Sequence, residues 1–79
     1  MTLREQLAGL VRRIVDEPDR VEIDEFDSAG ATVFEVRVAD DDLGKVIGRQ
    51  GRTARAIRSL LSERATQDGA RYEFEVVDE

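Results

Sequence analysis

Two glycines interrupt a helical pattern that lies between two predicted strands. Leu43, Val46 and Ile47 recur at helical spacing, and helical spacing resumes from residue 52 to about residue 67. Gly48 and Gly51 frame the break, so the pattern predicts a short helix over roughly 41–47 and a longer one over 52–67. A connection that contains helices is a crossover, and a crossover joins parallel strands. The strands on either side of this segment are therefore expected to be parallel.

The amino-terminal residues predict a further amphipathic helix. Thr2 and Glu5 have the spacing of a capping box, and apolar residues at helical intervals follow for about four turns. Pro18 stops this helix, because proline cannot continue the hydrogen-bond ladder. The helix over 52–67 also has an apolar inner face, which we expect to carry Ala54, Ile57, Leu60 and Leu61. Arg64 falls on the same face, near the helix end, where its charged head can reach solvent.

Alternation of apolar and polar residues predicts three strands. The first runs from Val21 to Phe26, a turn cluster occupies residues 27–30, the second strand covers 31–39, and the last begins at Tyr72. The element order is αββααβ, which gives an α+β fold with a three-stranded mixed sheet. We expect the aromatic residues of the strands to lie in the core: Phe26, Phe34, Tyr72 and Phe74. Tyr72 has a second interpretation, as a platform on which a base stacks.

Composition narrows the chemistry that the chain can perform. The 79 residues suit one compact domain, and they include no Cys and no His. Their absence removes the thiol nucleophile, the imidazole base and the usual zinc ligands. We therefore expect no enzyme, no metal site and no cofactor. The first sixteen residues contain charged residues among the apolar ones, so they lack a signal-peptide core and a membrane span, which predicts a cytoplasmic protein.

Charge is segregated along the chain. The formal net charge is −6, yet residues 44–58 contain no acidic residue. Their basic residues are Lys45, Arg49, Arg52, Arg55 and Arg58. We expect this segment to bind an anion. A solvated helix face is the simpler interpretation for Arg55 and Arg58, because both lie away from Ile57 and Leu61.

The glycine-containing segment resembles several kinds of phosphate-binding loop, and the neighbouring residues distinguish between them. A Walker loop requires Gly-Lys followed by Ser or Thr, and a dinucleotide fingerprint requires glycines directly after a strand; neither condition is met. A helix, Ile-Gly-x-x-Gly, helix arrangement remains, in which backbone passes close to a sugar-phosphate chain. The simpler interpretation is a tight connection between helices, with Gly48 in the left-handed conformation and Gly51 admitting the next helix. That interpretation does not account for the basic residues around the loop.

The loop and the element order together resemble a type II KH domain. The run Gly44-Lys45-Val46-Ile47-Gly48-Arg49-Gln50-Gly51-Arg52-Thr53-Ala54 is similar to that of the KhpA family of small bacterial single-KH RNA-binding proteins. The resemblance covers residues 1–79 as one KH domain, with its Gly-x-x-Gly loop at 48–51. It implies parallel, adjacent last strands, helices packed on one face of the sheet, and a groove for about four nucleotides. Ala54 departs from the larger aliphatic residue of many KH domains, so sequence preference is not carried over.

The resemblance also implies the residues that contact RNA. Gly48 and Gly51 allow close approach of the backbone, basic side chains neutralise phosphate, and Gln50 at the loop tip offers a polar contact. Val46 and Ile47 form the core or the floor of the groove. The complete set of expected RNA-binding residues is Lys45, Val46, Ile47, Gly48, Arg49, Gln50, Gly51, Arg52 and Arg55.

The expected partners follow from the same resemblance. It implies single-stranded RNA as ligand and a heteromer with a larger KH-containing protein, KhpB (also called Jag or EloR), linked to RNA chaperone activity and to control of the cell wall and cell length. A homodimer is the other expected assembly, because one groove binds weakly and a second site must come from another chain. Two alternatives stay open: a protein-interaction module on a KH frame, and a binder of single-stranded DNA.

Overall fold

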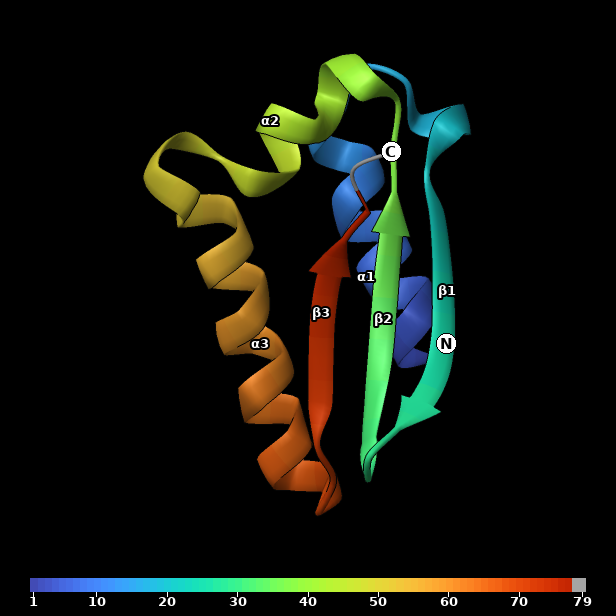
Figure 1. Cartoon of the computed structure of the whole chain (residues 1–79), viewed down its shortest axis with the longest axis vertical. Coiled ribbons are helices and arrows are strands. Elements are labelled where there is room, and N and C mark those ends of the chain that lie inside the picture. Colours follow the sequence, from blue (N-terminus) through green and yellow to red (C-terminus); the bar gives the residue numbers. More distant parts are fainter. Residues whose placement is uncertain (78–79) are drawn as a thin grey trace.

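The computed structural model describes residues 1–77 and confirms the predicted element order (Figure 1). The three helices are α1 (Leu3–Ile14), α2 (Leu43–Ile47) and α3 (Arg52–Asp68), and the three strands are β1 (Glu22–Ser28), β2 (Ala31–Arg37) and β3 (Tyr72–Val76). Three short 3-10 turns lie between them: η1 (Pro18–Arg20), η2 (Asp40–Asp42) and η3 (Arg49–Gly51).

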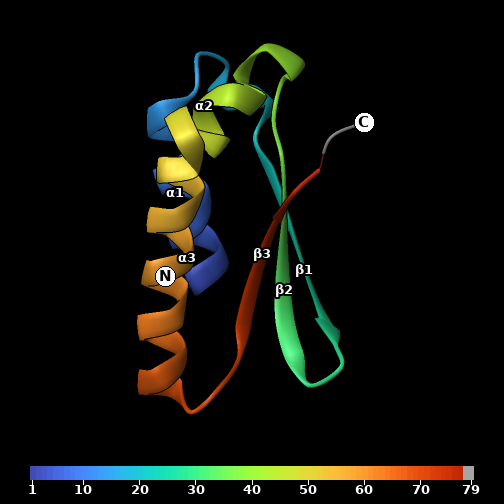
Figure 2. The same cartoon turned by 60° about the vertical axis from the view of Figure 1, so that its left-hand side comes forward.

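One mixed sheet forms the layer on which the helices pack. Its strand order is β1-β2-β3, with β1 antiparallel to β2 and β2 parallel to β3, as the crossover predicts. In this register Phe34 of β2 lies beside Phe74 of β3. Figure 2 shows the helices on one side of the sheet and leaves the other side open. The expected α+β architecture of a type II KH fold is therefore confirmed.

The start of α1 is fixed by the predicted capping box. The Glu5 backbone N–H donates to the Thr2 hydroxyl at 3.1 Å, and the Thr2 N–H donates to the Glu5 carboxylate at 3.2 Å. These bonds satisfy backbone donors that the first turn of a helix leaves free. The helix ends at Ile14, before Pro18, and Pro18 begins η1 instead.

The core lies between the sheet and the helical layer. Its least exposed apolar side chains come from the three helices and from the central strand β2: Val11, Phe34, Val36, Val46 and Ile57. The Tyr72 ring packs edge-on against Phe34, with centroids 5.9 Å apart, and its hydroxyl donates to Asp68 at 2.7 Å. Tyr72 is thus half-buried on the inner face, as its alternation with Phe74 predicts.

Two residues expected in the core are exposed. Phe26 is 42% exposed, because β1 continues to Ser28 in register with β2 and places Phe26 opposite Val33 on the open face of the sheet. Val33 is buried there. Leu60 is 57% exposed, because the inward face of α3 is narrow and is filled by Ala54, Ile57 and Leu61.

A buried carboxylate ties the end of α1 to the start of α2. Asp42 is 1% exposed, and its carboxylate accepts the backbone N–H of Asp16 at 3.1 Å and that of Glu17 at 3.0 Å. The Lys45 ammonium also donates to Asp42, at 3.4 Å. The Asp16 N–H bond is the main cause that lowers the pKa of Asp42 below its usual value. Asp42 therefore holds α2, and with it the glycine loop, in a fixed place on the fold.

We expect Asp42→Asn to lower the melting temperature by several degrees at pH 7. Asparagine offers one carbonyl oxygen where two N–H donors need acceptors. Because the folded pKa is lowered, the carboxylate stabilises the fold at pH values above the unfolded pKa of about 3.9, and this stabilisation disappears as pH falls through the folded pKa. Circular dichroism melts should therefore show the two proteins converging in acid. Asp41→Asn, at an exposed neighbour, is the control and should melt like the unchanged protein.

Candidate nucleic-acid interface

Gly48 occupies a backbone conformation that other residues rarely adopt. Its φ is +79° and its ψ is 165°, so it is not the left-handed helical cap that the simpler interpretation expects. A Cβ atom at this position would lie 2.7 Å from the Thr53 backbone nitrogen and 2.4 Å from the Thr53 hydroxyl oxygen. Gly48 is therefore required for α2 to turn directly against the start of α3.

Gln50 and Gly51 carry the chain through the tip of the loop in left-handed conformations. Gln50 has φ +57° and Gly51 has φ +72°. Nothing lies within 4 Å of a Cβ built on Gly51, in contrast to Gly48. Gln50 is exposed, and the tip of the loop leaves the body of the fold at the α2–α3 corner (Figure 1). The loop thus offers bare backbone to a ligand at Gly51, whereas Gly48 shapes the turn.

Three of the predicted arginines surround this loop. Arg49 lies within it, Arg52 is the first residue of α3, and Arg55 reaches back from α3 to donate to the Gln50 carbonyl at 3.4 Å. All three side chains are exposed. The Arg52 N–H already donates to the Arg49 carbonyl, but Gly51 provides no side-chain cap, so the next N–H groups of the first turn of α3 have no side-chain acceptor and can face an anion. The loop therefore combines cationic side chains with backbone donors.

Lys45 is positioned differently from the arginines. Its ammonium donates to the Asp16 carboxylate at 2.9 Å and to Asp42 at 3.4 Å. The bond to Asp16 is the main cause that raises the pKa of Lys45. Its charge is therefore already balanced by carboxylates within the fold, which the sequence pattern alone did not indicate.

The two apolar residues before Gly48 divide between core and surface. Val46 is fully buried, and Ile47 is 45% exposed. Val46 therefore lies in the core, as expected, whereas Ile47 does not, and the place of Ile47 in the floor of a groove stays a prediction. The exposed side chain of Ile47 places an apolar surface beside the cationic loop.

A groove runs along α3 beside the edge strand β3. It has a volume of about 360 Å³ and is lined by Arg58 and Leu61 of α3 and by residues 72–75 of β3. The Arg58 guanidinium carbon lies 5.7 Å from the centre of the Phe74 ring, within range of a cation–π contact. The sequence left Arg58 open between a solvated helix face and an anion contact, and the expected RNA-binding set does not include it. The sequence feature that could have indicated this contact is the position of Arg58, about one helical turn after Arg55, on the helix that the crossover places beside β3.

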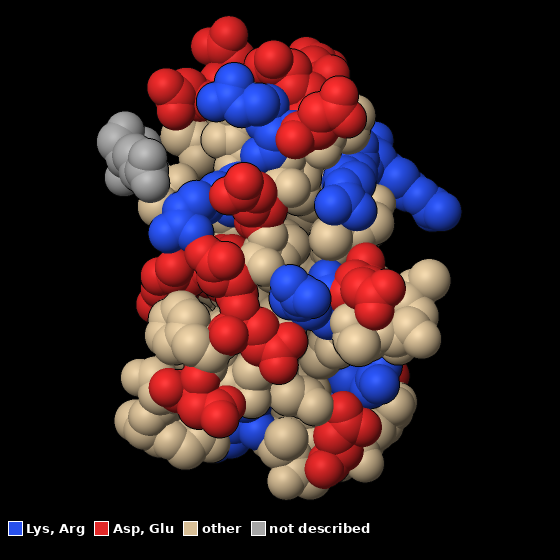
Figure 3. Space-filling view, turned by 90° about the vertical axis from the view of Figure 1, so that its right-hand side faces the viewer, with Lys and Arg blue, Asp and Glu red and all other residues tan. Residues whose placement is uncertain are grey.

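Outside residues 44–58, acidic residues outnumber basic ones. Figure 3 shows the β1 side of the molecule, where carboxylates are spread over the sheet edge and over the η1 and η2 turns. Among the described residues no group of carboxylates has a metal-binding arrangement. In the same part of the chain, no helix is long and apolar enough to cross a membrane.

Comparison with known proteins identifies the family. Residues 4–76 match the family described as "KhpA/KhpB, KH domain". The chain is 48% identical to an RNA-binding protein KhpA of Leifsonia xyli, over 92% of this chain and 93% of that one. It is 42% identical to the Treponema pallidum protein of the same name and 38% identical to the Chlamydia trachomatis one, over 98% or more of each chain in both cases.

No solved structure matches the chain. The family assignment therefore rests on sequence, and the order of helices and strands, the mixed sheet and the Gly-x-x-Gly turn agree with it. The chain belongs to the KhpA/KhpB family of KH domains.

Proposed function

We propose that the chain is a cytoplasmic protein that binds single-stranded RNA through the 48–51 loop, with residues 1–79 acting as one KH domain. The observation that carries this proposal is the loop itself, in which bare backbone and three exposed arginines meet in a segment free of carboxylates. The curated relatives are named RNA-binding proteins, which supports the same ligand. Because the family consists of non-enzymatic binding domains, the chain is not an enzyme.

The proposed contacts differ from residue to residue. Arg49, Arg52 and Arg55 neutralise phosphates, and Gly51 brings the backbone close to the strand. Gln50 adds a polar contact at the tip. Val46 and Gly48 hold the loop in place without touching RNA, and Ile47 lies against sugars or bases. Lys45 makes a weaker contact, because Asp16 and Asp42 already pair with it.

Gly51→Asp should weaken RNA binding about tenfold relative to Gly51→Asn. Both side chains have the same shape, both enter open space, and Asn and Asp tolerate positive φ better than most residues. Only the aspartate adds a negative charge beside phosphate. Fluorescence anisotropy with a short labelled RNA measures the difference.

Two further measurements make this comparison decisive. Melting curves of both variants check that the fold is retained, and a DNA of the same sequence tests the alternative that single-stranded DNA is the ligand. Equal affinities of the two variants, close to that of the unchanged protein, would show that the loop does not contact phosphate. Substitutions of Gly48 are unsuitable for the test, because the Cβ atom of any other residue there would clash with the Thr53 backbone.

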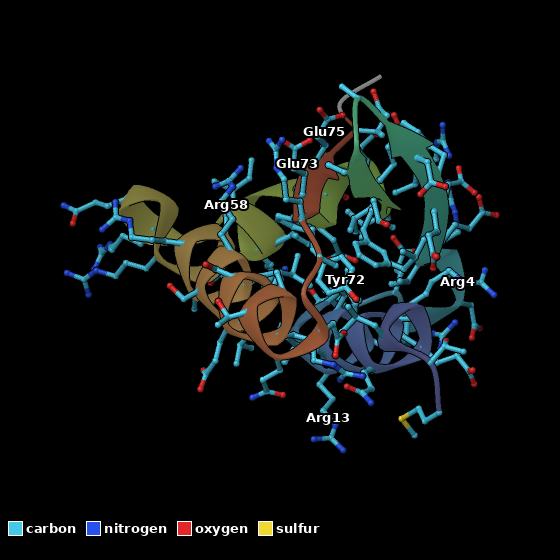
Figure 4. All side chains as sticks on the ribbon, turned by 90° about the horizontal axis from the view of Figure 1, so that it is seen from below. Arg4, Arg13, Arg58, Tyr72, Glu73 and Glu75 are labelled. Carbon is cyan, nitrogen blue, oxygen red and sulfur yellow. The ribbon has the colours of Figure 1, made fainter. Side chains whose placement is uncertain are left out.

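Binding should depend on salt with a slope of log affinity against log salt near −2. Each phosphate contact on a single strand contributes about −0.7, and three exposed arginines surround the loop. Arg52→Ala should reduce the slope by about one contact. Arg13→Ala removes the same charge from α1, where the side chain points away from the fold (Figure 4), and should leave the slope unchanged. A slope near zero for the unchanged protein would mean that the arginines form only a solvated face.

We propose further that the protein acts with a second RNA-binding chain, as an RNA chaperone or a post-transcriptional regulator. One groove for about four nucleotides binds weakly, and linking two grooves raises affinity by about 10² to 10⁴. The second chain is another copy or a larger KH-containing partner of the KhpB (Jag, EloR) type. The link to cell-wall and cell-length control that the family resemblance implies would act through this complex.

An apolar groove on the helical side supports such an assembly. It lies between α1 and α3, has a volume of about 360 Å³, and includes Leu3, Leu10 and the exposed Leu60. Exposed apolar surface of this kind favours a protein contact. None of the residues that line it belongs to the 44–55 segment, so an occupied groove leaves the loop free.

Leu60→Glu should abolish association, because it places a charge in the apolar groove. Light scattering at micromolar concentration, with and without the larger partner, measures the mass of the particles. Ser59→Glu adds the same charge to α3 outside this groove and serves as the control. A protein that is monomeric in both cases and still binds short RNA at nanomolar strength would refute the argument from avidity.

A further inference from the structure

A groove separates α1 from the strand β1. It has a volume of about 640 Å³, and its lining includes Ala8 and Gly9 of α1 and residues 21–24. Arg4 also lines it, and Figure 4 shows this side chain projecting from α1 on the β1 side of the molecule. None of the lining residues belongs to the 44–55 segment, so this groove is separate from the glycine loop.

The packing around Gly9 does not require glycine. Gly9 lies within α1, and a Cβ atom built on it meets no other part of the fold within 4 Å. Glycine inside a helix is less stable than alanine, because it loses more conformational freedom on folding. Ala8, the neighbouring residue, is equally small and is buried. The helix therefore leaves space beside β1 that a side chain from another molecule can fill.

The other wall of the groove is a free edge of the sheet. Within residues 1–77, the strand order β1-β2-β3 gives β1 a neighbouring strand on one side only, and Figure 3 faces the other side. An edge strand carries backbone N–H and C=O groups that can pair with a further strand. Charged side chains often protect such an edge from pairing, and β1 has four carboxylates. Protection alone does not explain the space at Gly9.

The alternation of β1 determines which side chains an added strand would need. Ile23 is buried on the helical side of the sheet, whereas Glu22 and Asp24 are exposed on its open face. Side chains directly opposite each other on neighbouring strands lie about 4.5–5.5 Å apart. Basic residues two positions apart would therefore pair with these two carboxylates. The residue between them would point toward Ala8 and Gly9, where an apolar side chain leaves water.

We propose that β1 binds an extended segment of a partner protein with a basic–apolar–basic sequence. The segment adds a strand to the sheet edge, so its backbone supplies hydrogen bonds and its alternate side chains supply selectivity. The basic side chains complement Glu22 and Asp24, and the apolar one fills the groove at Gly9. A second copy of β1 fits less well, because its four carboxylates would face carboxylates, and like charges opposite each other destabilise a sheet.

The test uses a labelled synthetic peptide of about eight residues in which Lys and Val alternate. Fluorescence anisotropy should give a Kd of roughly 100 μM with the unchanged protein. A peptide with proline in place of each valine has the same charge but lacks backbone donors, and it should bind at least about tenfold more weakly. Hydrogen exchange should slow in residues 22–28 when the Lys-Val peptide is bound.

Two substitutions of Gly9 form a matched pair. Leucine and alanine both suit a helix better than glycine, so both variants should melt at or above the temperature of the unchanged protein. Gly9→Leu fills the groove and should weaken peptide binding at least about tenfold, whereas Gly9→Ala leaves most of the space and should change it less than about twofold.

The contribution of charge is tested separately. Glu22→Gln should weaken binding of the Lys-Val peptide about threefold, because it removes one cross-strand charge pair. Glu17→Gln removes the same charge from an exposed position outside the groove and should leave the affinity nearly unchanged. An equal effect of both variants would overturn the proposed pairing, since only the net charge of the protein would then matter.

Three further results would overturn the proposal. Equal binding of the peptide by Gly9→Leu and by the unchanged protein would show that no side chain enters the groove. No binding at about 1 mM peptide, well above the expected Kd, would mean that the carboxylates only protect the edge. Slower exchange of residues 22–28 at higher protein concentration, without peptide, would assign the edge to a second copy. None of these results depends on whether the glycine loop binds RNA.

Discussion

The close contact between Gly48 and Thr53 fixes the geometry on which the interface depends. At a φ of +79°, Gly48 ends α2 and lets the backbone pass where a Cβ would lie 2.7 Å from the Thr53 nitrogen. The start of α3, and therefore the direction of Arg52, Arg55 and Arg58, follows from this turn. The same turn directs α3 alongside β3 and so forms one wall of the groove. Gly51 has a different part, because open space surrounds it and only its φ favours glycine.

A second fixed point lies at the other end of α2. The buried Asp42 carboxylate accepts the N–H groups that follow α1, so α2 is held between this anchor and Gly48. A five-residue helix has too few internal hydrogen bonds to be stable alone, and the anchor compensates for that. Lys45 joins the same cluster, and its charge then serves the fold more than the ligand. The charge left for the proposed anion contacts is therefore concentrated in the three arginines around the loop.

The sequence predicted the elements well because most of them are specified locally. The capping box of Thr2 and Glu5, the glycine break and the alternation through Phe34 and Val36 depend on neighbouring residues, and the crossover rule then determined the parallel pair. Phe26 and Leu60 were assigned wrongly because hydrophobicity does not reveal how many helices cover a sheet. The pairing of Lys45 with Asp16 was equally hidden, since 29 residues separate them in the chain. Such long-range contacts depend on the packing of α2 against the end of α1.

An acidic chain can bind a polyanion when its charges are far enough apart. At physiological salt the Debye length is about 8 Å, so exposed carboxylates farther from the loop than this are largely screened, whereas arginines in direct contact with phosphate are not. The carboxylates of β3 are a different case, because they line the groove that continues from the loop. Their negative charge repels an RNA strand that lies in this groove with its phosphates toward β3. In the proposed complex the phosphates lie at the loop and away from β3, so the acidic balance of the chain would restrict the orientation of the ligand.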